Sequence, residues 1–238
     1  MRLAINVDHF ATLREARKAA EPEPVLAALL AEQAGAEGVV CHLRTDRRHI
    51  NECDLKLLRS TVKTKLNMEM AATDEMMAVA LEVKPDVVSL VPERPEELTT
   101  EGGLDVAGHK AHLAETIGKL KAAGIRVSIF VDPSVPQIKA CAAAGVDLVE
   151  INTGKFAEAK PGQARAKALA EVERAAKTAA KLKLEVHAGH GLDYHNVGPI
   201  VAIPEISELS IGFAIVARAA ISGIELAVSD MVALLGRD

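Results

Sequence analysis

The sequence has no tryptophan and very few other aromatic residues, which together make up 2% of its 238 residues. Proteins that bind single-stranded nucleic acid stack the bases on aromatic side chains inside a basic groove. This chain lacks those aromatic residues, and its formal net charge is -5. We therefore expect no nucleic-acid partner.

Long apolar runs and paired cysteine motifs are also missing. No stretch reaches the roughly 20 apolar residues of a membrane span, and the first residues do not follow a signal-peptide pattern. The three cysteines, Cys41, Cys53 and Cys141, form no CxxC motif and are expected to be reduced thiols. These features predict a soluble cytoplasmic protein with no membrane partner.

What is present is a globular composition, with 49% hydrophobic and 26% charged residues. Short apolar runs alternate with helical patterns along the whole chain, at spacings of roughly 20 to 40 residues. Eight such runs are predicted as strands, at 2–7, 38–43, 65–70, 86–91, 126–131, 147–152, 184–189 and 206–211.

Eight strand–helix units predict one α/β domain over residues 1–238, a (β/α)8 TIM barrel. The strands are almost continuously apolar, as in parallel sheets that are buried on both faces. A doubly wound open sheet is the alternative, but it needs no eighth unit and usually carries GxGxxG after its first strand. Here that position reads DHFATL, which favours the barrel.

Polar residues collect near the carboxyl ends of the predicted strands, where barrel enzymes place their active sites. Such residues are often only caps or loop hydrogen bonds, but independent caps would not bring histidines and carboxylates to so many strands. Five of the eight histidines lie at or just past strand ends, and two glutamates lie where the barrel interior begins. The histidines are His9, His42, His49, His187 and His190, and the glutamates are Glu69 and Glu150.

The segment EVHAGHGL (185–192) places His190 between two glycines directly after the seventh strand. Glycine lets the backbone turn sharply and approach a ligand closely, and histidine exchanges protons near neutral pH. A surface loop is the alternative interpretation of this segment. Gly191 and Gly212 follow strands seven and eight, where barrels commonly bind phosphate at a helix N-terminus. Arg17, and Arg44 with His49, could serve a second anionic group.

These residues favour general acid–base catalysis on a phosphorylated substrate. No lysine lies at a strand carboxyl end, since Lys65 lies at the start of its strand and Lys155 lies beyond the sixth strand, and this disfavours a Schiff-base aldolase. A metal site is also disfavoured, because the first strand lacks a His-x-His pair and arginines lie nearby. From these residues we expect no metal.

Several motifs together resemble the pyridoxine 5'-phosphate synthase family. They are NVDHFATLREAR, HLRTDRRHI, NMEMA, LVPERPEELTTEGGLDV, EINTG and AGHGLDYHNV, and they extend over nearly the whole chain. The resemblance implies a (β/α)8 barrel with extra short helices, assembled as a homo-octamer. It also implies condensation of 1-deoxy-D-xylulose 5-phosphate with 3-amino-2-oxopropyl phosphate, which releases phosphate and water and needs no cofactor.

The resemblance also assigns roles to residues. It implies that His42 and Glu69 are proton acceptors, that His190 is a proton donor and that Glu150 stabilises the transition state. The sugar phosphate would be held by Asp8, His9, Arg44, His49 and Thr99, and the amino-ketone phosphate by Asn6, Arg17, Gly191, Gly212 and Phe213. Many members have Gly-His where this chain has Gly212-Phe213, which leaves a side-chain contact there in doubt.

Two other functions remain open at this point. A phosphosugar isomerase or epimerase can use the same fold and would act without the amine substrate. A phosphate-ligand sensor would need neither Glu69 nor His190.

Overall fold

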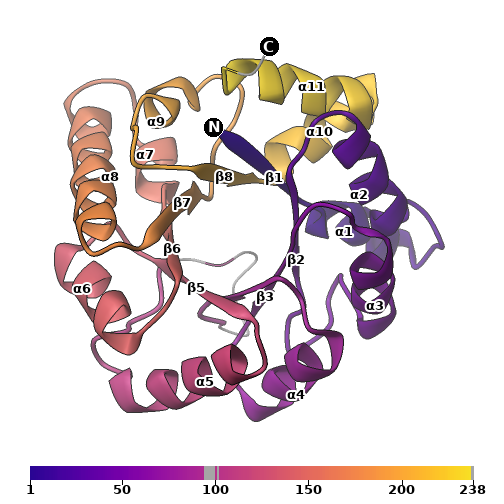
Figure 1. The fold of residues 1–238 in the computed structure, drawn as a ribbon. Coiled ribbons are helices and arrows are strands. Elements are labelled where there is room, and N and C mark those ends of the chain that lie inside the picture. Colours follow the sequence, from indigo (N-terminus) through magenta and orange to yellow (C-terminus); the bar gives the residue numbers. More distant parts are fainter. Residues whose placement is uncertain (94–99, 101, 237–238) are drawn as a thin grey trace.

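The computed structural model describes residues 1–93, 100 and 102–236. In that part of the chain the strands close into a parallel barrel in the order β1 to β8 (Figure 1). The strands are β1 (Arg2–Asn6), β2 (Gly38–His42), β3 (Leu66–Met70), β4 (Val87–Leu90), β5 (Arg126–Val131), β6 (Leu148–Asn152), β7 (Glu185–Gly189) and β8 (Glu208–Ile211). The predicted (β/α)8 barrel is confirmed.

Helices surround the barrel and cover the outer faces of the strands (Figure 1). The helices are α1 (Asp8–Arg17), α2 (Pro24–Gln33), α3 (Glu52–Thr61), α4 (Asp74–Val83), α5 (Lys110–Ala122), α6 (Val135–Ala144), α7 (Gly154–Glu158), α8 (Gln163–Lys181), α9 (Gly198–Val201), α10 (Phe213–Ser222) and α11 (Ile224–Leu234). In the described part of the chain, β1, β6 and β8 are each followed by two helices, α1 and α2, α7 and α8, and α10 and α11, which adds to the simple strand–helix repeat. None of the helices in the described ranges is long and apolar enough to cross a lipid bilayer.

Local sequence explains how several helices start. Asn51 and Asp54 form a capping box at the start of α3, in which each side chain accepts a backbone N–H. The Thr73 hydroxyl accepts from the Met76 N–H at the start of α4. Pro24 occupies the first turn of α2, where its missing N–H costs nothing.

Two helical features do not follow from apolar periodicity alone. The polar segment after β1, which has no clear apolar periodicity, forms α1. It buries Arg14 against Asp54, with two nitrogen–oxygen distances of 2.8 Å, so an ion pair forms part of a buried face that also contains Phe10 and Ala11. The apolar segment after β8 forms two helices, because Gly223 separates α10 from α11 with a φ of 83°.

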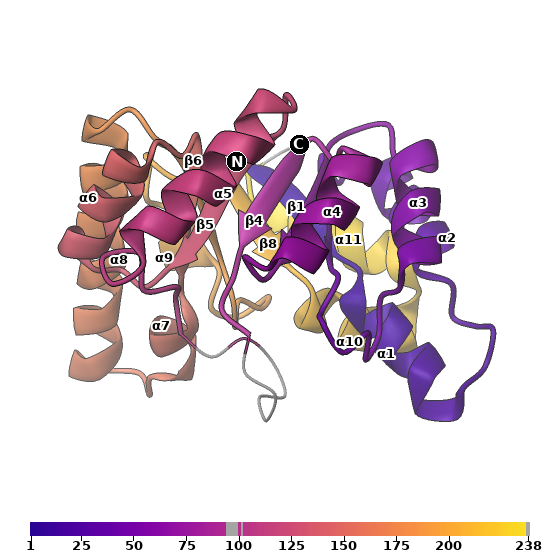
Figure 2. The same ribbon diagram turned by 90° about the horizontal axis from the view of Figure 1, so that it is seen from below.

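The main hydrophobic core consists mostly of Ala, Val, Leu, Ile and Met side chains, and on each strand it takes alternate positions, such as Leu3 and Ile5 of β1. Strands β2 and β6 are buried along their whole length. Since parallel strands run in one direction, their carboxyl ends lie together at one end of the barrel. Figure 2 shows α1 and α7 at that end, opposite the N-terminus.

Candidate active site

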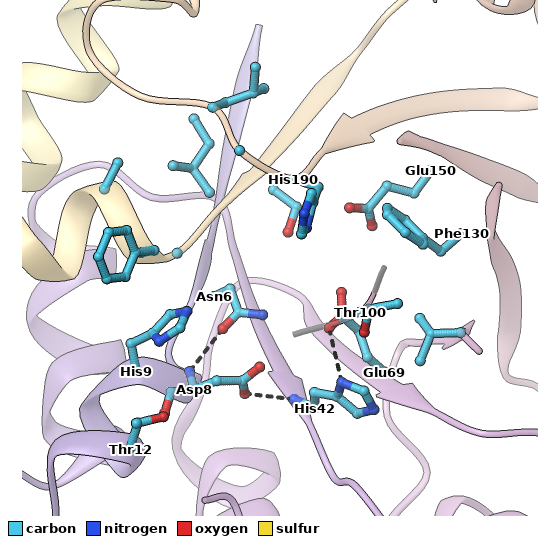
Figure 3. A pocket seen from close by; sticks show the side chains of 18 of the residues that line it. Asn6, Asp8, His9, Thr12, His42, Glu69, Thr100, Phe130, Glu150 and His190 are labelled. Atoms are coloured by element: carbon cyan, nitrogen blue, oxygen red, sulfur yellow. Dashed lines mark hydrogen bonds and ion pairs between the residues drawn. The ribbon is translucent and has the colours of Figure 1, made fainter. Parts of the chain in front are cut away.

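A cavity of about 830 Å³ opens at the carboxyl ends of the strands. It is lined by most of the residues predicted for the site: Asn6, Asp8, His9, His42, Arg44, His49, Glu69, Glu150, His190, Gly191, Gly212 and Phe213. Figure 3 shows Asp8, His42 and Glu69 on one side of it, and His190 and Glu150 on the other.

The first side of the cavity is organised by backbone contacts. Asp8 Oδ1 accepts the backbone N–H of His42 at 2.7 Å, and the Asn6 side chain accepts the N–H of Asp8 at 2.9 Å. His42 and Glu69 are register partners on the adjacent strands β2 and β3. Their side chains consequently meet, with His42 Nδ1 3.8 Å from Glu69 Oε2.

The two glutamates are hard to ionise. Burial raises the pKa of Glu69 well above its ordinary value, and the nearby carboxylates of Glu150 and Asp8 raise it further, while the Arg44 guanidinium opposes them. Burial, followed by the charge of Glu208, raises the pKa of Glu150 to about 7, against the effect of Lys65. Carboxyls of this kind exchange protons near neutral pH.

His190 has an unusual backbone conformation for a residue with a side chain, with a φ of 80°. The Thr153 hydroxyl lies 2.6 Å from the carbonyl oxygens of both Gly189 and His190 and fixes this turn. The His190 ring lies at an angle to Phe130, with ring centroids 6.2 Å apart. Strained residues held by their surroundings are concentrated at functional sites, so the geometry disfavours a simple surface loop.

The two loop glycines allow close backbone approach. Gly191 has a φ of 73°, and a Cβ there would lie 2.7 Å from the Cβ of Ala157. At Gly212 a Cβ would lie 3.0 Å from the Cβ of Asn6. Gly212 also directly precedes α10, so the first N–H groups of that helix lie at the cavity.

Phe213 lines the same end of the cavity, with 70% of its surface exposed. Its ring meets His9 edge to face, at a centroid distance of 5.3 Å. Because phenylalanine offers no polar contact, an anion here would depend on backbone N–H groups.

Both His9 and His49 favour the neutral form. Burial lowers the pKa of each, although the charge of Asp8 opposes this effect. The His49 Nδ1 accepts the backbone N–H of Ile50 at 2.8 Å.

Three predicted positions are not part of the described cavity. Thr99 lies outside the described residues, although its neighbour Thr100 lines the cavity. Arg17 is exposed at the far end of α1, nine residues and so roughly 13 Å along the helix from Asp8. The placement of His187 at the cavity rim was wrong, because it lies within β7, with ring nitrogens 3.1 Å from Glu185 and 3.4 Å from Glu208.

Comparison with known proteins identifies the family. Residues 3–237 match the family described as "Pyridoxal phosphate biosynthesis protein PdxJ". The chain belongs to the PdxJ family. It is therefore an enzyme of vitamin B6 biosynthesis.

Relatives of this PdxJ chain match it over almost its full length. A protein from Synechococcus sp. (strain JA-2-3B'a(2-13)) is 54% identical over 98% of both chains. Another from Geobacter sulfurreducens is 53% identical, also over 98% of both chains. Both relatives are named pyridoxine 5'-phosphate synthase.

Solved structures with low sequence identity share the fold. Phosphoribosyl anthranilate isomerase from Thermus thermophilus has a TM-score of 0.61 at 17% identity, and the match covers 99% of this chain and 98% of that one. Thiamine phosphate pyrophosphorylase from Pyrococcus furiosus also has a TM-score of 0.61, at 16% identity, with coverages of 99% and 95%.

The PdxJ cavity contains a group of side chains that could hold a metal ion. Among the described residues, only Asp8, His42 and Glu69 bring three ligand atoms within 4.8 Å of one another. A metal ligand must be deprotonated, whereas Glu69 favours its neutral form. Lys65 lies at the opposite end of the barrel, where it pairs with Glu208. The absence of a metal requirement stays a prediction.

Sequence reasoning missed two residues near the reacting groups, Phe130 and Glu93. Phe130 lines the cavity beside His190, but a phenylalanine inside an apolar strand looks like any core residue. Glu93 is in contact with His42 although it lies in a different loop, 51 positions along the chain. Only the folded barrel brings these two loops together.

Proposed function

We propose that this enzyme is a pyridoxine 5'-phosphate synthase. It would condense 1-deoxy-D-xylulose 5-phosphate with 3-amino-2-oxopropyl phosphate, close the pyridine ring, and release phosphate and water. The observation that carries the proposal is the pair of buried carboxyls with raised pKa, Glu69 and Glu150, which face one cavity together with His42 and His190. The family membership and the names of the relatives support it.

The reaction needs several proton transfers, because an imine must form and water must be eliminated before the ring becomes aromatic. In the proposal, His42 and the ionised form of Glu69 accept protons from the condensing substrates, and His190 donates one to a leaving oxygen. Glu150 stabilises the charge that develops in the transition state. Each group of this kind typically contributes about 10²- to 10⁴-fold in rate.

Two phosphorylated substrates need two anion sites. We assign the amino-ketone phosphate to the backbone around Gly191 and Gly212, at the start of α10, where helix N–H groups favour an anion. We assign the sugar phosphate to the side with Arg44 and His49, which also line the cavity. The contacts expected from Arg17 and Thr99, the octameric assembly and the cytoplasmic location remain predictions.

The test is to mix the purified enzyme with both substrates and to follow pyridine absorbance and released phosphate together. Equal amounts of ring product and phosphate are expected, and Glu69→Gln should abolish turnover while both substrates still bind. His190→Asn should accumulate an early condensed intermediate.

Other outcomes would refute the proposal. Consumption of the sugar phosphate without the amine would indicate an isomerase. Binding of both phosphates with no turnover would indicate a sensor. Near-normal turnover in Glu69→Gln would remove that residue from its proposed role.

A further inference from the structure

Both oxygens of the Glu93 carboxylate have hydrogen-bond partners at the edge of the cavity. It follows β4, and only 8% of its side-chain surface is exposed. Its Oε2 accepts the backbone N–H of Thr45 at 3.1 Å and the Thr45 hydroxyl at 2.8 Å. Its Oε1 lies 2.8 Å from Nε2 of His42.

The charge on Glu93 decides how this contact works. Burial raises the pKa of Glu93, but hydrogen bonds from His42 and Thr45 outweigh it and bring the pKa to about 2. At neutral pH the group is an anion that accepts hydrogen bonds and donates none. His42 must therefore donate through Nε2.

A neutral imidazole carries one proton, so a proton on Nε2 leaves Nδ1 as the acceptor. Nδ1 is the nitrogen that lies 3.8 Å from Glu69 Oε2. The backbone of His42 is held separately, by its N–H bond to Asp8. The ring is thus held at two points, with its basic nitrogen directed toward Glu69.

We propose that Glu93 is a positioning residue, which keeps the proton of His42 on Nε2 and directs Nδ1 toward the reacting atoms as the base. The inference rests on the proposed function, in which His42 accepts a proton. When Nδ1 takes that proton, the imidazolium keeps its Nε2 proton and Glu93 stays ionised. The carboxylate stabilises the new positive charge, as in other carboxylate–histidine pairs.

Glu93→Gln gives a sharp test, because the backbone N–H and the hydroxyl of Thr45 both donate to Oε2 and require an oxygen at that position. The glutamine carbonyl should take the place of Oε2, so that its amide NH₂ faces His42 Nε2. His42 would then accept at Nε2 and carry its proton on Nδ1, which prevents Nδ1 from acting as a base. We expect kcat to fall about 10²- to 10⁴-fold, with a much smaller change in KM.

Two matched variants distinguish loss of the positioning of His42 from general disruption of the site. Glu93→Ala removes the acceptor without imposing the reversed tautomer, so it should retain more kcat than Glu93→Gln. Thr45→Val removes one donor to Glu93 but keeps the backbone N–H and the contact with His42. It should keep kcat within about tenfold of wild type.

The tautomer can be measured without any turnover. In protein labelled with ¹⁵N-histidine, the ring nitrogens of His42 are identified by the signals that His42→Asn removes. Wild type and Thr45→Val should show a protonated Nε2, and Glu93→Gln should show a protonated Nδ1. Circular dichroism checks that each variant is folded.

The kinetic and the ¹⁵N measurements together distinguish failure of the proposed function from failure of the positioning role of Glu93. If the wild-type enzyme makes no ring product but shows a protonated Nε2, the proposed function fails and the structural role of Glu93 stands. If the enzyme is active and Glu93→Gln keeps its kcat, the positioning role is refuted. A wild-type His42 with its proton on Nδ1 would refute it even if no Glu93 variant folds.

Discussion

Replacing Glu150 by glutamine should stabilise the protein at alkaline pH much more than at acid pH. The side chain of Glu150 is buried in the barrel, and burial together with Glu208 raises its pKa from 4.5 to about 7, against the opposing effect of Lys65. The folded state therefore favours the neutral carboxyl over the carboxylate. Its contribution to stability is fully present below pH 4.5 and is lost as the pH rises through about 7.

The size of this loss follows from the two pKa values. Each pKa unit is worth about 1.4 kcal/mol, so the whole shift of Glu150 corresponds to about 3 kcal/mol. Most of it, about 2 to 3 kcal/mol, falls between pH 5 and pH 8. Glutamine has no charge at either pH and avoids this loss. The variant should gain that amount relative to wild type across the same range.

Urea unfolding at pH 5, 6, 7 and 8 measures the difference, with variant and wild type at the same protein concentration. Glu158→Gln is the control, because Glu158 is an exposed carboxylate at the end of α7. For that variant the difference from wild type should not change with pH. The Glu150→Gln difference should rise through pH 7.

A Glu150→Gln difference that stays constant from pH 5 to pH 8 would refute the reasoning, because it would mean that Glu150 ionises as easily in the folded chain as in the unfolded one. Loss of Glu150 should also make Glu69 easier to ionise, since the charge of Glu150 is one cause of the raised pKa of Glu69. Easier ionisation of Glu69 also stabilises the variant relative to wild type at higher pH. It therefore adds to the stabilisation expected from Glu150 itself and cannot hide it.

Three further substitutions test the geometry around the site. Arg14→Met should reduce the free energy of unfolding by about 3 to 5 kcal/mol, because it leaves Asp54 buried without its partner. Urea unfolding measures the change, and an unchanged free energy of unfolding would contradict the prediction. Gly154→Ala places a Cβ 2.8 Å from Cδ2 of His190. It should lower kcat at least about tenfold, whereas Gly118→Ala, an open position in α5, should leave kcat unchanged. Gly191→Ala should cost about 1 to 2 kcal/mol of stability because its φ is 73°, and calorimetry should show weaker phosphate binding.

The barrel could be predicted because its strands are short, apolar and regularly spaced. Buried parallel strands need no polar alternation, and the helices between them show their own periodicity. Helix α1 did not show it, because part of its buried face is Arg14, whose partner Asp54 lies 40 positions away. A charged residue looks solvent-exposed until its partner is known.

The site could be predicted as far as it depends on strand ends. Residues such as His42, Glu69 and Glu150 were identified because the carboxyl ends of parallel strands must meet. His187 was misplaced, since its partner Glu208 comes from a strand in which the sequence gives no sign of the contact. Glu93 was missed because its contact with His42 joins the loops after β2 and β4.

The barrel interior contains carboxyl groups at both ends, and their surroundings shift pKa values in opposite directions at the two ends. At the amino ends of the strands, Glu208 meets Lys65, Arg2 and His187. Glu185, in the same layer, has a lowered pKa, for which the largest cause is its hydrogen bond with His187, followed by burial, which opposes it, and by bonds from Arg126 and Arg2. Glu185 therefore stays ionised, and both glutamates contribute to structure through these contacts.

At the carboxyl ends, no lysine lines the described cavity, and Arg44 only partly offsets the burial of Glu69. A buried carboxylate without a close cation is costly, so the proton stays on until a substrate or a change in pH removes it. The two ends thus differ in how closely lysine and arginine approach the carboxyl groups. This difference explains why the pKa values of Glu69 and Glu150 are raised while that of Glu185 is lowered.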